Sequence, residues 1–522
     1  MSFKIGALAK EHSLMEIPLN IKFAFLPVLL LAFLGLECDT VGQERIDGLR
    51  NRLKEHVLSN GMRFLLLENH ESPTVSFHIY YGVGSVDEQT GHTGIAHLYE
   101  HMAFKGTKQI GTTDYEAESR HFDRIDRLEA EITAEQDKGN MSDGAKISRL
   151  EAQLKKEQNA ADRYVVPNEI GKLYERNGGT GLQAQTERDE THYSVNLPSN
   201  KIELWMAIES DRFQHAVLRQ FYEERDVVME EMRQTIDTEP FNRLLLQETI
   251  TTAFHAHPYG LHSGIGWASD VSHLTRAEVQ AFFNKYYGAA NCTVAIVGDF
   301  DTATIIRMID RYFSSVPAGE KNRRLVTVEP AQEGERRVEL EVPTQPSLVL
   351  GYHRGDVLSI DSVLYDVVAS LLAGGHTSRL YKALVLDKKI ATGVEVLANP
   401  PLVTAKYPSL FEIIAQPVLP IHNVGDLEKA IYAEIDKLKE ERVDNLELRK
   451  ITNQAEAEFV RSMANNETLA RELAFTEGLE GDWRRLLTYR QRLADVTPED
   501  IMRVAKELFR KSNRTVAYIV PK

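Results

Sequence analysis

The chain has 522 residues, of which 43% are hydrophobic and 26% are charged, as is usual for soluble globular proteins. Because domains usually contain about 100–200 residues, this length predicts two large domains rather than one core. The formal net charge of −16 argues against nucleic acid or anionic lipid as the main partner.

Residues 1–44 are predicted to be a leader. Phe23 to Leu36 is an apolar run that follows Lys22, and it suits a signal peptide better than a spanning helix, which needs about 20 residues. Export to the periplasm, or anchoring in a membrane with the protein facing the periplasm, is therefore expected. Thr40-Val41-Gly42 is the best candidate cleavage site. Cys38 would suit a lipid anchor except that Glu37 precedes it, so cleavage and anchoring stay open, as does an uncleaved apolar segment. Cys38 and Cys292 are not expected to form a structural disulfide.

After the leader, the sequence predicts a β-hairpin and a strand. Asn60-Gly61 stands between two apolar runs within residues 57–69, a strong turn signal. Residues 74–83 (TVSFHIYYGV) are rich in β-branched and aromatic side chains, which favour a strand.

A helix with two histidines follows, in the sequence GHTGIAHLYEHMAFKGT. His97 and His101 are four residues apart and share a helix face, so both can bind one metal ion, with Glu100 beside them. A zinc ion with protein ligands and one open position is a hydrolytic site, and H-x-x-E-H is a metalloprotease signature. The alternative is a polar helix face with two histidines by chance.

Residues 117–166 are charged and helical in pattern. Apolar residues recur at helical spacing on both sides of a break at Gly139 and Ser142-Asp143-Gly144, which predicts an antiparallel helical hairpin inserted in the first domain. Its charged face is expected to be solvated, and partner binding is the alternative.

Residues 178–195 are interpreted as a glycine loop followed by a strand. Two helices are predicted next, and the second, FYEERDVVMEEMRQ, is strongly acidic. A catalytic zinc site needs a third protein ligand, and this helix offers two pairs of glutamates at seven-residue spacing. Spacing alone cannot choose between Glu224 with Glu231 and Glu223 with Glu230.

The later half contains a repeat. Residues 275–297 and 497–519 share a threonine with an acidic residue three positions later, then a helix, a turn with asparagine and a strand, all without a gap. This predicts an α+β protein made of two homologous α/β domains. We expect a catalytic domain over residues 45–316, a linker over 317–335 and a C-terminal domain over 336–522, which lacks H-x-x-E-H.

HLYEHMAFKGT and ERDVVMEEM together resemble the signatures of the pitrilysin/insulinase zinc peptidases, or inverzincins, most closely the bacterial and mitochondrial-processing-peptidase-like branch. GDFD after a strand and HPYG at 257–260 also fit, and the resemblance covers about residues 50–520. It implies one Zn²⁺ per chain, with His97, His101 and Glu231 as ligands. Glu100 is then the general base that activates a zinc-bound water, and Glu224 is a supporting carboxylate.

The resemblance also implies an edge strand that binds peptide substrates, at Gln183 and Ala184. The family has asparagine and tyrosine where this chain has Gln183 and Gln185, which puts specificity in doubt. The family also supplies an arginine and a tyrosine from the second half, where alignment gives Val385 and Thr392.

The resemblance further implies that family members of this length form half of a clamshell, in which two halves enclose a chamber. We therefore expect a homodimer, or a heterodimer with a homologous subunit that supplies the arginine and tyrosine.

The leading interpretation is a zinc endopeptidase that hydrolyses peptides or unfolded protein segments. The alternatives are a non-catalytic or partner-dependent half-shell that binds peptides or a homologous subunit, and a metal-dependent hydrolase of another substrate. His92, His192 and His353 are expected to be structural or surface groups.

Overall fold

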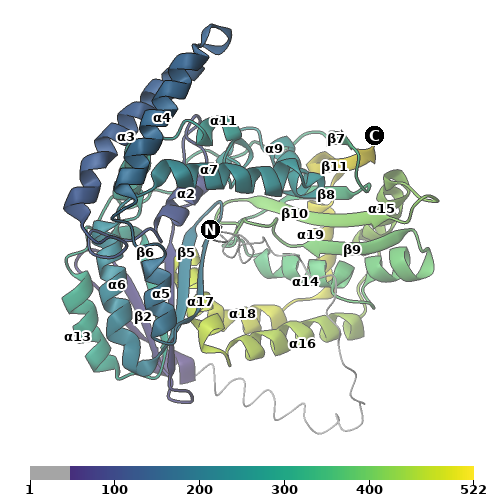
Figure 1. Ribbon diagram of the computed structural model, residues 1–522. Coiled ribbons are helices and arrows are strands. Elements are labelled where there is room, and N and C mark those ends of the chain that lie inside the picture. Colours follow the sequence, from purple (N-terminus) through teal and green to yellow (C-terminus); the bar gives the residue numbers. More distant parts are fainter. Residues whose placement is uncertain (1–47) are drawn as a thin grey trace.

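The structure is a computed structural model that describes residues 48–522, drawn in Figure 1. The predicted leader lies outside the described residues. Within residues 48–522, no helix combines the length and apolar character needed to cross a bilayer. The chain forms two β-sheets with helices around them, and a long helical hairpin projects from one corner (Figure 1).

The first sheet has six strands in the order β1-β2-β6-β3-β5-β4. Its strands are β1 (Lys54–Val57), β2 (Arg63–Glu68), β3 (Thr74–Tyr81), β4 (Thr180–Thr186), β5 (Thr191–Pro198) and β6 (Cys292–Gly298). The predicted hairpin around Asn60-Gly61 is the antiparallel pair β1 and β2, and Gly61 adopts a φ of 91° that suits glycine. The interpretation of residues 178–195 as a loop and one strand was wrong. They form two antiparallel strands, in which Thr180 pairs with Asn196 and Gln183 with Ser194, and the register shifts between them around Gly181.

Helices of the first half pack on one face of this sheet. Phe77 and Ile79 of β3 point into this core, where the Phe77 ring stacks on Trp205 with 4.4 Å between centroids. Full burial of one such side chain contributes about 1.5–3 kcal/mol. The helices are α2 (Ile95–Met102), α5 (Glu169–Arg176), α6 (Ile202–His215), α7 (Phe221–Met232), α12 (Arg276–Tyr286) and α13 (Thr302–Phe313).

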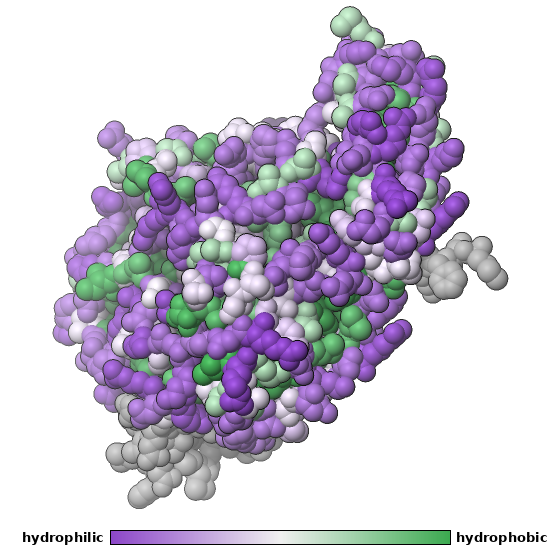
Figure 2. Space-filling model, turned by 90° about the vertical axis from the view of Figure 1, so that its left-hand side faces the viewer, coloured by the Kyte–Doolittle hydropathy of each residue, from purple (hydrophilic) through white to green (hydrophobic). Residues whose placement is uncertain are grey.

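The predicted helical hairpin is α3 (Tyr115–Gln136) with α4 (Gly144–Ala161). Asp114 and Asp143 cap their N-termini by accepting hydrogen bonds from backbone N–H groups. Leu128, Ile132, Leu150 and Leu154 are buried between the two helices. Figure 2 shows that the projecting part is covered mostly by hydrophilic side chains, so its outer surface is solvated.

The second sheet has five strands in the order β7-β11-β8-β10-β9. Its strands are β7 (Arg336–Val342), β8 (Leu348–Arg354), β9 (Ala391–Leu397), β10 (Ser409–Pro417) and β11 (Arg514–Pro521), and its helices include α14 (Ser362–Ala373), α15 (Val424–Glu440), α16 (Asn445–Ser462), α18 (Arg484–Ala494) and α19 (Pro498–Leu508).

The repeat is visible in the structure. Thr275 and Thr497 each form a capping box, with Glu278 and Asp500, at the start of α12 and α19. Each of these helices leads into a strand, β6 or β11, that pairs in parallel with the first long strand of its half, β2 or β7.

The two halves exchange helices. α17 (Asn466–Glu480), from the second half, buries Leu469, Leu473 and Ala474 against β2 and β6 of the first sheet. The π-helical turn η5 (Leu244–Glu248) and α9 (Thr249–Ala253), from the first half, pack on the second sheet. Each sheet therefore has one face covered by its own half and the other face covered by the opposite half.

Candidate metal centre

The two histidines of helix α2 remain partly accessible because the apolar residues of the helix are buried in the core. Leu98 and Met102 are fully buried, and Ala96 packs beside them. Glu88 lies just before the helix, and its buried carboxylate accepts hydrogen bonds from the N–H groups of Gly94, at 2.9 Å, and Ala96, at 3.0 Å. These N–H groups have no partner within the helix, so Glu88 fixes the start of α2.

Helix α7 brings the glutamates to the histidines. It begins after Gln220, whose φ is 53°, and it buries Val228 in the core. Glu224 and Glu231 face α2. Of the alternative pair, Glu230 is exposed and bound to Arg233, while Glu223 lines a pocket beneath the helical hairpin. The tertiary structure thus separates two pairs that spacing alone left equivalent.

One oxygen or nitrogen atom from each of His97, His101 and Glu231 lies within 4.8 Å of the others. The Nε2 atom of His101 is 3.3 Å from one Glu231 oxygen, and the Nε2 atom of His97 is 3.8 Å from the other. The side chains of all three are partly accessible. Glu100, between the histidines, is 8% exposed.

Carboxylates dominate the electrostatics around His101. Burial alone lowers its pKa, but hydrogen bonds to Glu224 and Glu231 and the charge of Glu100 outweigh burial and raise the pKa to about 10. A field that favours a positive charge on this ring also favours a metal cation. Two imidazoles and a carboxylate, with room for a further ligand, are the donor set of catalytic zinc, so the residues fit that ion.

Glu224 contacts the ring of His101. Its Oε1 atom is 3.1 Å from Nδ1 of His101, which leaves Nε2 directed at Glu231. Burial raises the pKa of Glu224, but His101 and Lys105 together lower it below its usual value. The ion pair from the Lys105 ammonium to the other Glu224 oxygen was missed in the sequence. Helical spacing gave no signal for it, because α2 ends at Met102 and Lys105 lies in the loop that follows.

Strand β4 is the free edge of the first sheet and contacts α2. Gln183 is exposed, and Ala184 packs against the core. A small hollow behind this edge is lined by Phe104, Leu182 and Tyr193 among other residues, none of which the sequence singled out.

The remaining predicted positions make other contacts. Val385 packs against the core of the second half, and Thr392 is exposed on β9, the edge of the second sheet. His92 contacts Glu278, His192 contacts Glu190, and His353 contacts the carbonyl of Ala253.

Comparison with known proteins gives matches over most of the chain. Residues 63–123 and 159–263 match the family described as Insulinase (Peptidase family M16), and residues 273–455 match the Peptidase M16 inactive domain. The zinc protease PqqE of Helicobacter pylori is 24% identical over 473 residues, which cover 89% of this chain and 92% of the relative. A probable mitochondrial-processing peptidase subunit beta of Arabidopsis thaliana is 21% identical over 450 residues, which cover 84% of this chain and 70% of the relative.

Solved structures share the fold. A protease from Helicobacter pylori matches with a TM-score of 0.73 and 24% identity, covering 90% of this chain and 99% of that one. The periplasmic protease PqqL of Escherichia coli matches with a TM-score of 0.66 and 17% identity, and the match covers 90% of this chain but only 47% of PqqL. Because both halves of the sequence match domains of one peptidase family and the fold agrees, this chain belongs to the insulinase (M16) family of peptidases.

Proposed function

We propose that this chain is a zinc-dependent endopeptidase that hydrolyses peptides or unfolded protein segments. The observation that carries the proposal is the convergence of His97, His101 and Glu231 within 4.8 Å, with Glu100 on the same turn of helix as the two histidines.

In the proposed mechanism, His97, His101 and Glu231 hold the ion. Zinc, when bound, supplies a Lewis acid that lowers the pKa of water and polarises the scissile carbonyl. Glu100 takes a proton from the attacking water as its oxygen bonds to the carbonyl carbon, and it delivers that proton to the amine nitrogen as the C–N bond breaks. Glu224, through its contact with Nδ1 of His101, would keep the Nε2 atom of that ring available as a ligand.

The substrate is proposed to bind as an extra strand on β4. This edge has no neighbouring strand among residues 48–522, and it lies beside α2. Backbone hydrogen bonds along Gln183 and Ala184 would hold an extended segment with little regard to sequence.

A second candidate is a half-shell that is active only with a homologous subunit. It is supported by Val385 and Thr392 at the positions where the family is expected to provide an arginine and a tyrosine, because neither side chain can stabilise an oxyanion with a positive charge. The match to PqqL covers only 47% of that protein, and this chain also matches a structure of its first half, so a unit like this chain can be part of a longer protein.

We propose export to the periplasm on two grounds. The apolar run at residues 23–36 suits a signal peptide, and PqqL of Escherichia coli is described as periplasmic.

The central experiment measures cleavage of unfolded peptides by the purified chain and by Glu100→Gln, with and without a chelator. We expect zinc bound by both proteins, cleavage by the wild type that the chelator abolishes, and at least a hundredfold slower cleavage by the variant. Equal cleavage by the wild type and by Glu100→Gln would show that other residues carry out the reaction. Zinc binding without cleavage by the wild type alone, with activity gained on adding a homologous subunit, would favour the second candidate.

A further inference from the structure

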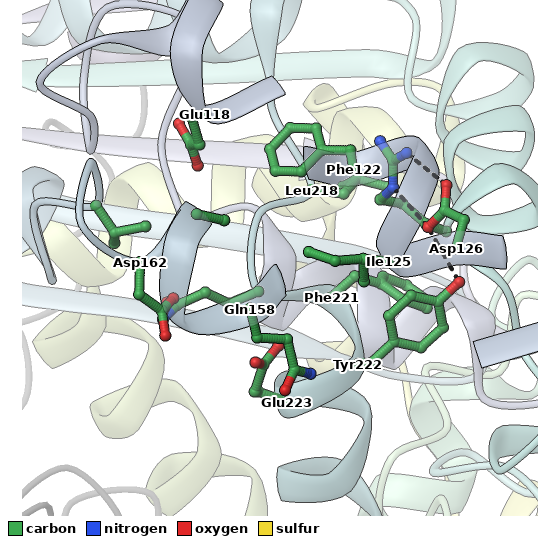
Figure 3. Close-up of a pocket in the computed structure, with 14 residues that line it drawn as sticks. Glu118, Phe122, Ile125, Asp126, Gln158, Asp162, Leu218, Phe221, Tyr222 and Glu223 are labelled. Carbon is green, nitrogen blue, oxygen red and sulfur yellow. Dashed lines mark hydrogen bonds and ion pairs between the residues drawn. The ribbon is translucent and has the colours of Figure 1, made fainter. Parts of the chain in front are cut away.

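The base of the helical hairpin is packed against the helix that carries Glu231. Figure 3 shows the seam, where Phe122 and Ile125 of α3 lie beside Phe221 and Tyr222 of α7. The Tyr222 hydroxyl donates to Asp126 at 3.1 Å. Deeper in the structure, Glu118 of α3 belongs to a second and fully buried contact.

That contact is centred on Arg219, just before α7. Its side chain is 1% exposed, and that of Glu118 is fully buried. The guanidinium Nε donates to Glu118 at 2.9 Å, and the two terminal nitrogens donate to the carbonyls of Lys105, Thr107 and Ile110 in the loop after α2. The fork of Arg219 therefore joins α3, the end of α2 and the start of α7.

The loop after α2 is shaped to admit this guanidinium. Gly106 and Gly111 have φ values of 104° and 86°, which L residues rarely adopt. A Cβ atom on either glycine would lie 2.7 Å from a terminal nitrogen of Arg219. Both glycines therefore serve the same contact.

These contacts close a ring through the metal centre. Arg219 holds the backbone of Lys105, and the Lys105 ammonium pairs with Glu224. Glu224 binds Nδ1 of His101 and lies on α7, only five residues after Arg219. The ring thus joins the end of α2 to the start of α7, the helix that also carries Glu231.

We propose that Arg219, with Glu118 and Lys105, forms a positioning device that fixes α7 against α2 and so sets the distance from Glu231 to His97 and His101. The proposal rests on the proposed zinc site. It assigns the base of the helical hairpin a role in metal binding. A buried ion pair by itself is weak evidence for stabilisation, since apolar replacements of equal volume are often no less stable. What this pair provides is a fixed geometry at a junction of three segments.

The test measures zinc affinity by competition with a chelating indicator, for the full chain and for Arg219→Lys and Lys105→Met. Arg219→Lys keeps the charge but loses the fork, and Lys105→Met removes the link to Glu224. We expect each variant to bind zinc at least tenfold more weakly, as is usual for groups that orient metal ligands. For cleavage of a short peptide, we expect kcat to fall with KM changed less than threefold.

The matched control is Arg514→Lys. Arg514, at the start of β11 in the second half, pairs with Glu335 and is also largely buried. This control should lower Tm as Arg219→Lys does but leave zinc affinity unchanged.

Wild-type zinc affinity in folded Arg219→Lys and in Lys105→Met would overturn the proposal, as would an equal loss of affinity in Arg514→Lys. If Arg219→Lys does not fold, Glu118→Gln replaces it under the same criterion. If the wild type binds zinc but cleaves no peptide, the proposed function fails while the zinc affinities still decide the positioning role.

Discussion

Buried carboxylates have two kinds of surroundings in this protein. Glu88 caps a helix, and Glu118 is held by Arg219, so both keep hydrogen-bond partners where water is excluded. Glu412 on β10 is different. It is fully buried, and neither of its carboxylate oxygens has a hydrogen-bond partner. Burial raises its pKa to about 8, although the charge of Arg188 opposes the shift.

Glu412 should make folding stability depend on pH. Because its pKa in the folded chain lies above the ordinary value of 4.5, the folded state binds a proton that the unfolded state releases. Its contribution to the free energy of unfolding is fully present below pH 4.5. That contribution is lost as the pH rises to about 8, at up to about 1.4 kcal/mol per pH unit. In Glu412→Gln, the fall in Tm between pH 6 and 8 should be smaller than in the wild type.

The matched control for Glu412→Gln is Glu333→Gln, which changes an exposed carboxylate in the linker. It should retain the wild-type dependence of Tm on pH. An unchanged slope in Glu412→Gln would show that this carboxyl group does not titrate in the folded chain.

The two glutamate pairs on α7 allow a direct comparison of roles. Glu231→Gln should reduce zinc affinity most, because it removes a ligand charge, and Glu224→Gln should reduce it about 10–100-fold, because it only orients His101. Glu223 and Glu230 are also glutamates of α7, but their side chains point away from the histidines. Glu223→Gln and Glu230→Gln should therefore leave zinc affinity unchanged. If Glu223→Gln or Glu230→Gln lowered zinc affinity as much as Glu231→Gln does, the assignment of Glu231 as the zinc ligand would be wrong. Isothermal titration with zinc measures all four.

Among the secondary-structure elements, the helical hairpin divides into two parts. The insulinase-family match omits residues 124–158, whereas Glu118 lies inside it. The base contacts α7 through Asp126 and Glu129, and the outer part is a solvated pair of helices.

Shortening the helical hairpin should therefore be harmless to the site. Replacing residues 130–147 with a Gly-Ser-Gly turn keeps Glu118, Asp126 and Glu129, so zinc affinity and cleavage of short peptides should stay within about twofold of the wild type. Replacing residues 118–158 with the same turn should impair both. If the shorter deletion already abolishes zinc binding, the outer part also supports the site.

For the whole molecule, the exchanged helices make each half depend on the other. Without α17, the first half would expose Leu65, Leu67 and Val297, all fully buried in the full chain. At the junction, the Tyr259 hydroxyl donates to buried Asp189 at 2.7 Å, and Asp189 also accepts from Thr404 at 3.0 Å. These contacts join the two halves through a polar network centred on the buried Asp189 carboxylate.

The chain should therefore unfold as one cooperative unit. Calorimetry should give a single transition for the full chain, and residues 48–330 expressed alone should be aggregated or unfolded, because an uncovered sheet face exposes its apolar surface. Two separate transitions, or a stable isolated first half, would contradict this expectation.

Local patterns in the sequence accounted for much of this protein. Asn60-Gly61, the two threonine capping boxes and the helical spacing of residues 117–166 depend on neighbours along the chain, and the structure contains each of them. Strand β4 was misread because Gly178, Gly179 and Gly181 suggest a loop. It forms a strand through its pairing with β5, a contact that local propensity does not contain.

By itself, the sequence determined the two-copy organisation and the pairing of His97 with His101, because a repeat and a helical spacing are properties of the chain alone. Helical spacing left the choice between the two glutamate pairs of α7 open; the family resemblance implied Glu224 and Glu231, and in the structure both lie beside the histidines. Only the tertiary structure decided that Lys105 contacts Glu224 and that Arg219 holds the backbone of Lys105. It also decided that each half covers the sheet of the other. The physical reason is that these contacts join segments distant in sequence, and their geometry is set by how the helices and sheets pack.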